Sequence, residues 1–160
     1  MAGREAISFH SRVDRSEMRI RALFSKILRN VEQSGVMIIC TEQDSPASQE
    51  KASAFEALGV EVLAMPNAFG KVDLPALFAY LAKDREMNEI HIESGFKLNG
   101  SMLRENCVDE LLLYYAPFFI GDGIGMANVP TIPSLDLKKD WQVIDHCLFG
   151  PDVRLRYIKN

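Results

Sequence analysis

The chain has 160 residues, of which 48% are hydrophobic and 25% are charged, with a formal net charge of −4. This size and composition are ordinary for one soluble globular domain with a buried core. The net negative charge argues against a nucleic-acid-binding protein, because such proteins carry a basic footprint. No apolar run is long enough to cross a bilayer, and the first residues lack the apolar segment of a signal peptide.

The cysteines and histidines predict neither a disulfide framework nor a metal centre. Because the three cysteines are an odd number without a close pair, they favour reduced thiols and an intracellular, cytoplasmic setting. The histidines are far apart, and no Cys/His pair has zinc spacing. The residues concerned are Cys40, Cys107, Cys147, His10, His91 and His146.

The N-terminal part has no clear structural pattern. Residues 1–16 show no clean hydrophobic period, and residues 17–30 fit either a helix or an irregular segment. We therefore expect residues 1–24 to be irregular or partly disordered, and residues 25–160 to form an α/β domain.

The next part of the chain alternates short apolar runs with helical patterns. Strands are predicted at 36–40, 60–65 and 89–93, with helices between and after them. This order predicts a parallel sheet covered by helices. In open sheets of this kind ligands bind beyond the carboxyl ends of the strands, and both Thr41 and Glu93 lie at such ends.

Two helices can be placed from their caps and apolar faces. The first is predicted from Ala47, with Gly59 as its C-cap. The second has Asp73 as its N-cap and Pro75 near its start. The expected buried faces are Ala54, Phe55 and Leu58 in the first helix, and Leu74, Leu77, Phe78 and Leu81 in the second.

The C-terminal part has a different pattern. A long strand is predicted at 108–117, followed by the glycine-rich loop Gly121–Gly125. Residues 141–149 and 153–158, separated by Gly150-Pro151-Asp152, predict an antiparallel hairpin. Parallel β-α units followed by such a hairpin predict an α/β domain with a mixed sheet.

The candidate functional stretch is His91–Leu103, interpreted as a strand, a small-residue turn and the first turn of a helix. Such a junction leaves N–H groups at the helix N-terminus that suit a phosphate, although a tight turn without a ligand explains Gly95 and Gly100 equally well. Glu93, at the end of a buried strand, needs a partner or a cleft. It either faces a ligand, caps the helix or pairs with an arginine.

The remaining candidates are weaker. Prolines follow Gly121–Gly125 where a helix would be needed, so a flexible loop is favoured there over a phosphate site. His91 is best interpreted as a structural histidine beside Ile90 and Ile92. Cys107 has no identifiable basic partner in the sequence, which argues against a catalytic thiol.

These motifs resemble the reductase domain of the riboflavin-biosynthesis deaminase-reductase family over about residues 25–158. That family typically has V-E-G-G-x-x-L-x-G-S-L-L, followed by V-D-E-L-x-x-Y-x-A-P-x-x-x-G. The matching residues here are Ile90–Gly95, Asn99–Arg104, Val108–Leu111, Tyr114 and Ala116–Pro117, and Gly150–Val153 resembles the final hairpin.

The resemblance implies a dihydrofolate-reductase-like fold and a homodimer. It also implies NADPH-dependent reduction of the ribosyl group of 5-amino-6-(5-phosphoribosylamino)uracil to a ribityl group. Glu93 and Arg19 would contact this substrate, and Thr41 would border the cofactor. The residues implied to hold the NADPH phosphates are Gly95, Phe96, Lys97, Leu98, Asn99, Gly100 and Ser101.

The sequence also departs from the family pattern. Glu-Gly-Gly is Glu-Ser-Gly here, and in the weak match at residues 15–21 Arg15 and Arg21 replace the expected Asp and Pro, while Arg19 is kept. The front looks shortened, and the zinc deaminase motifs are absent. Three interpretations remain open: the reductase, a truncated non-catalytic module for nucleotide binding or dimerisation, and an NAD(P)-binding domain with another substrate.

Overall fold

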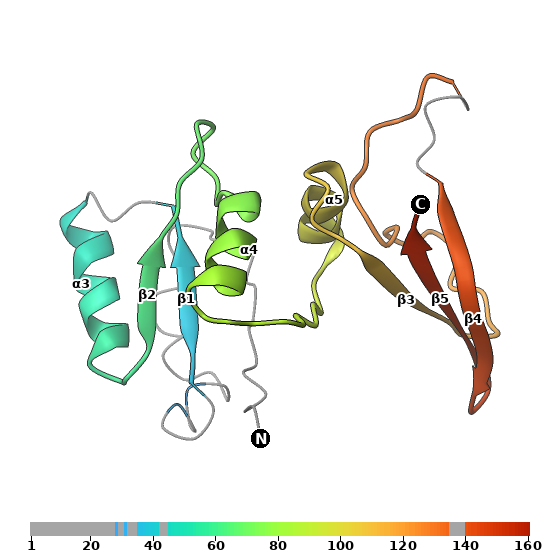
Figure 1. Cartoon of the computed structure of the whole chain (residues 1–160), viewed down its shortest axis with the longest axis horizontal. Helices are drawn as coiled ribbons and strands as arrows, with labels where there is room; N and C mark the ends of the chain where they lie inside the picture. Colours follow the sequence, from blue (N-terminus) through green and yellow to red (C-terminus); the bar gives the residue numbers. More distant parts are fainter. Residues whose placement is uncertain (1–27, 29–30, 32–34, 42–44, 135–139) are drawn as a thin grey trace. The chain divides into compact units, whose positions relative to one another are not determined.

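The computed structural model of the chain describes residues 28, 31, 35–41, 45–134 and 140–160 (Figure 1). The chain divides into two compact units, Met1–Ser94 and Gly95–Asn160, and each is described by itself. The predicted irregular segment 1–24, including Arg15, Arg19 and Arg21, lies outside the described residues.

The first unit contains a parallel pair of strands. β1 (Met37–Cys40) and β2 (Glu61–Ala64) pair with Ile38 opposite Val62, and Figure 1 shows their arrows side by side and pointing the same way. The helix α3 (Pro46–Glu56) connects them, and α4 (Leu74–Lys83) follows β2. The two predicted strands and their parallel pairing are confirmed.

The helix α3 begins with a capping box and ends before the predicted cap. The Ser45 and Ser48 side chains satisfy each other's backbone N–H groups, and Pro46 occupies the first turn. The C-cap is Ala57 rather than Gly59, which lies in the following turn with a φ of +81°. The predicted buried face was also partly wrong, because Leu58 is exposed, and Ala52 is the buried residue of this helix.

The helix α4 supplies three of the six buried apolar residues described in the first unit. Asp73 caps it as predicted, accepting a hydrogen bond from the Ala76 N–H at 3.0 Å. Leu74, Leu77 and Leu81 are fully or almost fully buried, which confirms three of the four predicted core positions. Burying a leucine side chain contributes about 1.5–3 kcal/mol. Phe78 is half-buried.

The third predicted strand, at 89–93, does not form. The segment is not part of any described strand, although Ile90 and Ile92 are half-buried while Glu89, His91 and Glu93 are exposed. This alternation is typical of an extended chain, but a strand also needs a partner for its N–H and C=O groups. Within the described residues no strand pairs with this segment, so the parallel series there has two strands.

The second unit is one helix and an antiparallel sheet. The helix is α5 (Phe96–Arg104), and the sheet contains β3 (Glu110–Tyr115), β4 (Trp141–Phe149) and β5 (Asp152–Lys159) in the order β3-β5-β4. Gly150, with a φ of +63°, lies in the turn between β4 and β5. The predicted C-terminal hairpin is confirmed. In the described residues, the parallel and antiparallel pairings lie in separate sheets.

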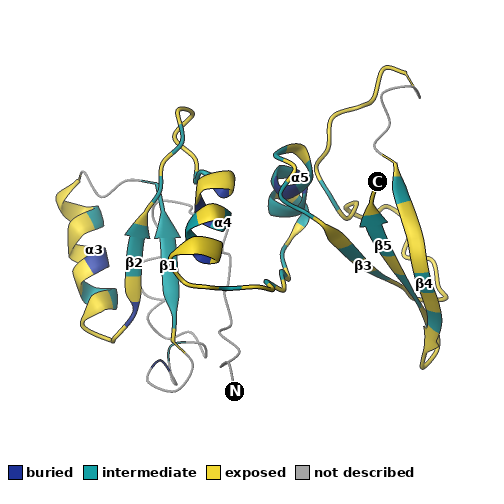
Figure 2. Ribbon diagram, viewed as in Figure 1, coloured by how far each residue is buried: buried dark blue, intermediate teal, exposed yellow. Residues whose placement is uncertain are grey.

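Large apolar side chains are exposed on both faces of the antiparallel sheet. Directly paired residues share a face, so Tyr115, Val153 and Leu148 form one row across the three strands. All three are exposed, and Leu148 most of all, at 75%. Figure 2 shows exposed stretches along β3 and β4. The opposite face exposes Tyr114 and Phe149 and also carries the ion pairs described below. None of the helices in the described part of the chain has the length and apolar character needed to cross a membrane.

Candidate functional site

The N-terminus of α5 is the first element of the candidate site. Gly95 is its N-cap, and no side chain caps this end. The first N–H with a helical acceptor is that of Asn99, which donates to the Gly95 carbonyl at 3.0 Å. The preceding N–H groups, from Phe96 to Leu98, therefore have the arrangement that binds anions at helix N-termini. The predicted small-residue turn is shorter than expected, because residues 96–101 are already helical.

Gly95 leaves the approach to this helix end open. Its φ of −92° is accessible to any residue, so no backbone strain requires glycine. Among the described residues, no atom lies within 4 Å of where its Cβ would be. The missing side chain thus leaves space over the helix N-terminus, which is the expected property of a position that a phosphate approaches.

A second segment of the chain is bound along α5. The Asn99 Nδ2 donates to the Met126 carbonyl at 2.8 Å, and the Asn128 N–H donates to the Phe96 carbonyl at 2.9 Å. Arg104 donates to the Asn128 carbonyl and, at 2.9 Å, to the Ser101 hydroxyl. We call these contacts between α5 and residues 126–128 the clasp.

Gly100 belongs to the clasp. A Cβ at this buried glycine would lie closer than 3.0 Å to three backbone atoms of Asn128. The structure therefore gives Gly100 a packing role. Sequence reasoning did not identify Asn128 or Arg104, and no local pattern could have done so, because these contacts join residues 24 or more positions apart.

The glycine-rich loop Gly121–Gly125 lies next to the clasp in sequence. No helix follows it within the described residues 121–134, which agrees with its interpretation as a loop. Gly125 approaches the N-terminus of α5, since its Cβ position is 3.9 Å from the Phe96 ring. Two glycine-containing segments that are separate in the sequence are therefore neighbours in the second unit.

The other predicted residues belong to the first unit. Thr41 is half-buried directly after β1. The Glu93 side chain is 89% exposed, so the expectation that it ends a buried strand was wrong. Its Oε1 lies 3.5 Å from the Nε2 of His91, which is itself exposed rather than a buried structural histidine. Arg19, the remaining predicted substrate residue, lies outside the described residues.

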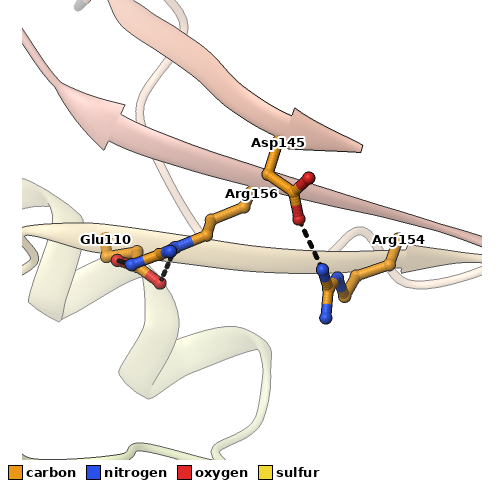
Figure 3. Close-up of polar contacts among 4 residues, drawn as sticks. All are labelled: Glu110, Asp145, Arg154 and Arg156. Carbon is orange, nitrogen blue, oxygen red and sulfur yellow. Dashed lines mark hydrogen bonds and ion pairs between the residues drawn. The ribbon is translucent and has the colours of Figure 1, made fainter. Parts of the chain in front are cut away.

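The face of the antiparallel sheet opposite Leu148 carries two ion pairs, which Figure 3 shows. The Arg156 guanidinium donates to both carboxylate oxygens of Glu110, at 2.7 and 2.6 Å. This hydrogen-bonded pair holds the pKa of Glu110 below its ordinary value. Arg154 donates to Asp145 at 2.5 Å, a contact that raises the pKa of Arg154, while its buried Nε lacks a hydrogen-bond partner in the described structure.

Within the described residues, no metal centre accompanies these side chains. The described part of the chain has no group of three or more His, Cys, Asp or Glu side chains placed to hold a metal. A shallow pocket, lined by Leu103, Val108, Trp141 and Lys159 among others, lies at the C-terminal end of α5. It is at the opposite end of the helix from Gly95. None of the three cysteines forms a disulfide within the described residues.

The parallel β-α units, the antiparallel sheet and the open helix N-terminus define a dihydrofolate-reductase-like α/β protein. The chain belongs to the RibD C-terminal domain family, whose model matches residues 10–155. It is 33% identical over 100 residues to the riboflavin biosynthesis protein RibD of Escherichia coli. It is 28% identical over 86 residues to a 5-amino-6-(5-phosphoribosylamino)uracil reductase of Buchnera aphidicola.

Solved structures give the same fold. RibD of Acinetobacter baumannii matches 96% of this chain with a TM-score of 0.68 and 25% identity. A pyrimidine reductase-like protein of Corynebacterium diphtheriae matches 78% of it with a TM-score of 0.58 and 20% identity. The chain spans only part of its relatives: the matches cover 27% of the E. coli protein, 41% of the Buchnera protein and 36% of the A. baumannii protein.

Proposed function

We propose that the chain is an NADPH-dependent reductase of riboflavin biosynthesis that converts the ribosyl group of 5-amino-6-(5-phosphoribosylamino)uracil to a ribityl group. Family membership supports this reaction class, and the printed name of the Buchnera relative supports the substrate. The observation that carries the proposal is the uncapped, open N-terminus of α5 at Gly95.

The residues at this end of the helix fit a dinucleotide phosphate. The backbone N–H groups of Phe96, Lys97 and Leu98 would hold the anion, with the exposed Lys97 side chain adding a positive charge. Thr41 would border the cofactor. NADPH supplies the hydride when bound, so the protein's task is to orient the reactants and exclude water.

We assign the pyrimidine substrate to Glu93 and Arg19. A carboxylate suits the N–H groups of a uracil ring, and an arginine suits the phosphate of the ribose arm. The exposed position of Glu93 leaves its oxygens available to a ligand. No protein nucleophile is needed for hydride transfer, and none is assigned.

We further propose that the protein acts as a homodimer in the cytoplasm. The exposed apolar row Tyr115, Val153 and Leu148 supports self-association, because apolar side chains gathered on one sheet face favour burial against a partner. Three cysteines without a disulfide in the described structure agree with a reducing compartment.

Calorimetric titration with NADPH, followed by assay of the pyrimidine intermediate at saturating cofactor, tests the function. Binding and cofactor oxidation are expected, with Lys97→Ala weakening the affinity and Lys71→Ala, a comparable exposed lysine in the first unit, leaving it unchanged. Binding without turnover would instead support a non-catalytic nucleotide-binding module. Absence of NADPH binding would contradict both. Titration with NADH in parallel measures the preference for the 2′-phosphate.

A further inference from the structure

Three of the residues expected to touch the cofactor make contacts with other parts of the protein. The Asn99 amide donates to Met126, the Gly100 backbone packs on Asn128, and the Ser101 hydroxyl accepts from Arg104. These residues follow the first turn of α5, whereas the N–H groups that suit a phosphate come from residues 96–98. We therefore expect the clasp to have a function other than direct contact with the cofactor phosphate.

The clasp fixes the end of the glycine-rich loop. Residues 126–128 are tied to α5 by side-chain and backbone hydrogen bonds, and the loop Gly121–Gly125 immediately precedes them. The Cβ position of Gly125 is 3.9 Å from the Phe96 ring, which belongs to the first residue of the helix. The loop is thereby held next to the end of α5 where the phosphate would bind.

The loop itself presents open backbone and an apolar side chain. Within the described residues, the N–H groups of residues 121–125 donate to no backbone carbonyl, and no atom lies within 4 Å of a Cβ built on Gly121. Ile124 is 83% exposed. N–H groups without a described backbone acceptor and an exposed apolar side chain match the two parts of a dinucleotide, its pyrophosphate and its flat rings.

We propose that the loop Gly121–Gly125 is a second wall of the dinucleotide site, and that Asn99 and Arg104 are positioning residues that hold this wall through residues 126–128. This inference rests on the proposed function, because it takes NADPH as the ligand. It changes the assignment of Asn99, Gly100 and Ser101 from cofactor contacts to residues that act through the loop.

Amide hydrogen exchange of the full chain, with and without saturating NADPH, tests the inference. In the unmodified protein NADPH should slow exchange both at residues 96–98 and at residues 121–125. In Asn99→Ala the protection of residues 96–98 should persist at saturation, while that of residues 121–125 falls. The loss of one neutral hydrogen bond, about 1 kcal/mol, corresponds to an affinity reduced about fivefold.

The matched control is Asn67→Ala. The Asn67 side chain also bonds to the backbone, accepting from Phe69 and Lys71, but in the first unit, and its loss should leave loop protection unchanged. Arg104→Lys, which keeps a donor for Asn128, should retain more protection than Arg104→Ala. If Asn99 and Arg104 had only a structural role, each variant would have a lower melting temperature. NADPH protection would then not be lost selectively at residues 121–125.

The outcomes separate the two proposals. If NADPH protects residues 96–98 but not 121–125 in the unmodified protein, the second wall is wrong and the proposed function stands. If Asn99→Ala keeps full protection of the loop, the positioning role is wrong. If NADPH protects neither segment and does not bind, the proposed function itself fails.

Discussion

Gly100 and Asn128 lie so close together that no side chain fits between them. A Cβ on Gly100 would come within 3.0 Å of the nitrogen, the carbonyl carbon and the oxygen of Asn128. Glycine is a poor helix former, and in the middle of a helix it costs about 1 kcal/mol relative to alanine. Its presence in α5 is explained by this close approach of two backbone segments.

Gly100→Ala is therefore expected to destabilise the protein despite the better helix propensity of alanine. The methyl group must push residues 126–128 away from α5, and overpacking of this kind costs about 1–3 kcal/mol. Urea denaturation followed by circular dichroism measures the change. Ser53→Ala, at an exposed position of α3, is the control for helix propensity alone and should be neutral or slightly stabilising. A stabilised Gly100→Ala would contradict the observed packing.

Gly95→Val, in contrast, is expected to affect ligand binding more than folding stability. The φ of Gly95 suits any residue and its Cβ position is open, so the main cost to folding is the poorer N-cap, about 1 kcal/mol. The new side chain would occupy the space over the helix N-terminus, and NADPH binding should fall below detection. Paired melting and titration measurements distinguish the two effects. Unchanged affinity would mean that Gly95 only forms a turn.

The local features of this chain and the parallel pairing of β1 with β2 could be predicted from its sequence, whereas the contacts of α5 with residues 126–128 and the surroundings of residues 89–93 could not. The Asp73 cap and the three buried leucines of α4 follow from neighbouring residues, and the structure has them. The run 89–93 has the apolar residues of a strand, but pairing depends on another strand that the local sequence does not specify. Likewise, the pattern around Gly100 indicates only a position that needs glycine.

Glu93 shows the same limit in the candidate site. Its place after an apolar run predicted a carboxylate at a buried strand end, which would need a partner. In the absence of that strand the side chain is exposed beside His91. The family motif identified the residue, and its surroundings depended on pairing that the sequence does not encode locally.

Glu93→Gln is expected to reduce turnover of the pyrimidine substrate without weakening NADPH binding or folding. The Glu93 side chain is exposed, so replacing its carboxylate with an amide should change the folding stability little. Loss of a charged hydrogen bond to a ligand corresponds to about 1.5–3 kcal/mol, or about 10- to 100-fold in kcat/KM. Steady-state kinetics measures the effect, with Glu89→Gln as an exposed control. Equal activity in both variants would remove Glu93 from the substrate site.

The pair Glu110–Arg156 predicts a stability that depends on acid pH. Because the hydrogen bond from Arg156 lowers the pKa of Glu110 in the folded protein, the pair stabilises the fold fully above the ordinary carboxyl pKa of 4.5. That contribution is lost as the pH falls below 4.5 and through the lower pKa that Glu110 has in the folded protein. Glu110→Gln should be less stable than the unmodified protein at neutral pH, and the difference should shrink on acidification.

Melting temperatures between about pH 7 and about pH 3 measure this convergence, which spans the range where carboxyl groups titrate. Glu89→Gln serves as the matched control, since Glu89 is exposed and makes no ion pair within the described residues. Its difference from the unmodified protein should stay small at every pH. High salt should also reduce the Glu110 effect, because both partners are partly exposed. A constant difference across the pH range would contradict the assigned pairing.

Leu148→Lys tests the proposed dimer. Leu148 is 75% exposed and shares a row with Tyr115 and Val153, so a lysine there adds a charge to this exposed apolar row without disturbing the core. Sedimentation velocity should show the unmodified protein as a dimer and the variant as a monomer, with unchanged circular dichroism.

Gln142→Lys places the same charge on the opposite face of β4, because Gln142 pairs with Ile158 and shares its face with Arg156. The Gln142 variant should remain a dimer. Dissociation of both variants would indicate a general charge effect, and a Leu148 variant that stays dimeric would place the interface elsewhere.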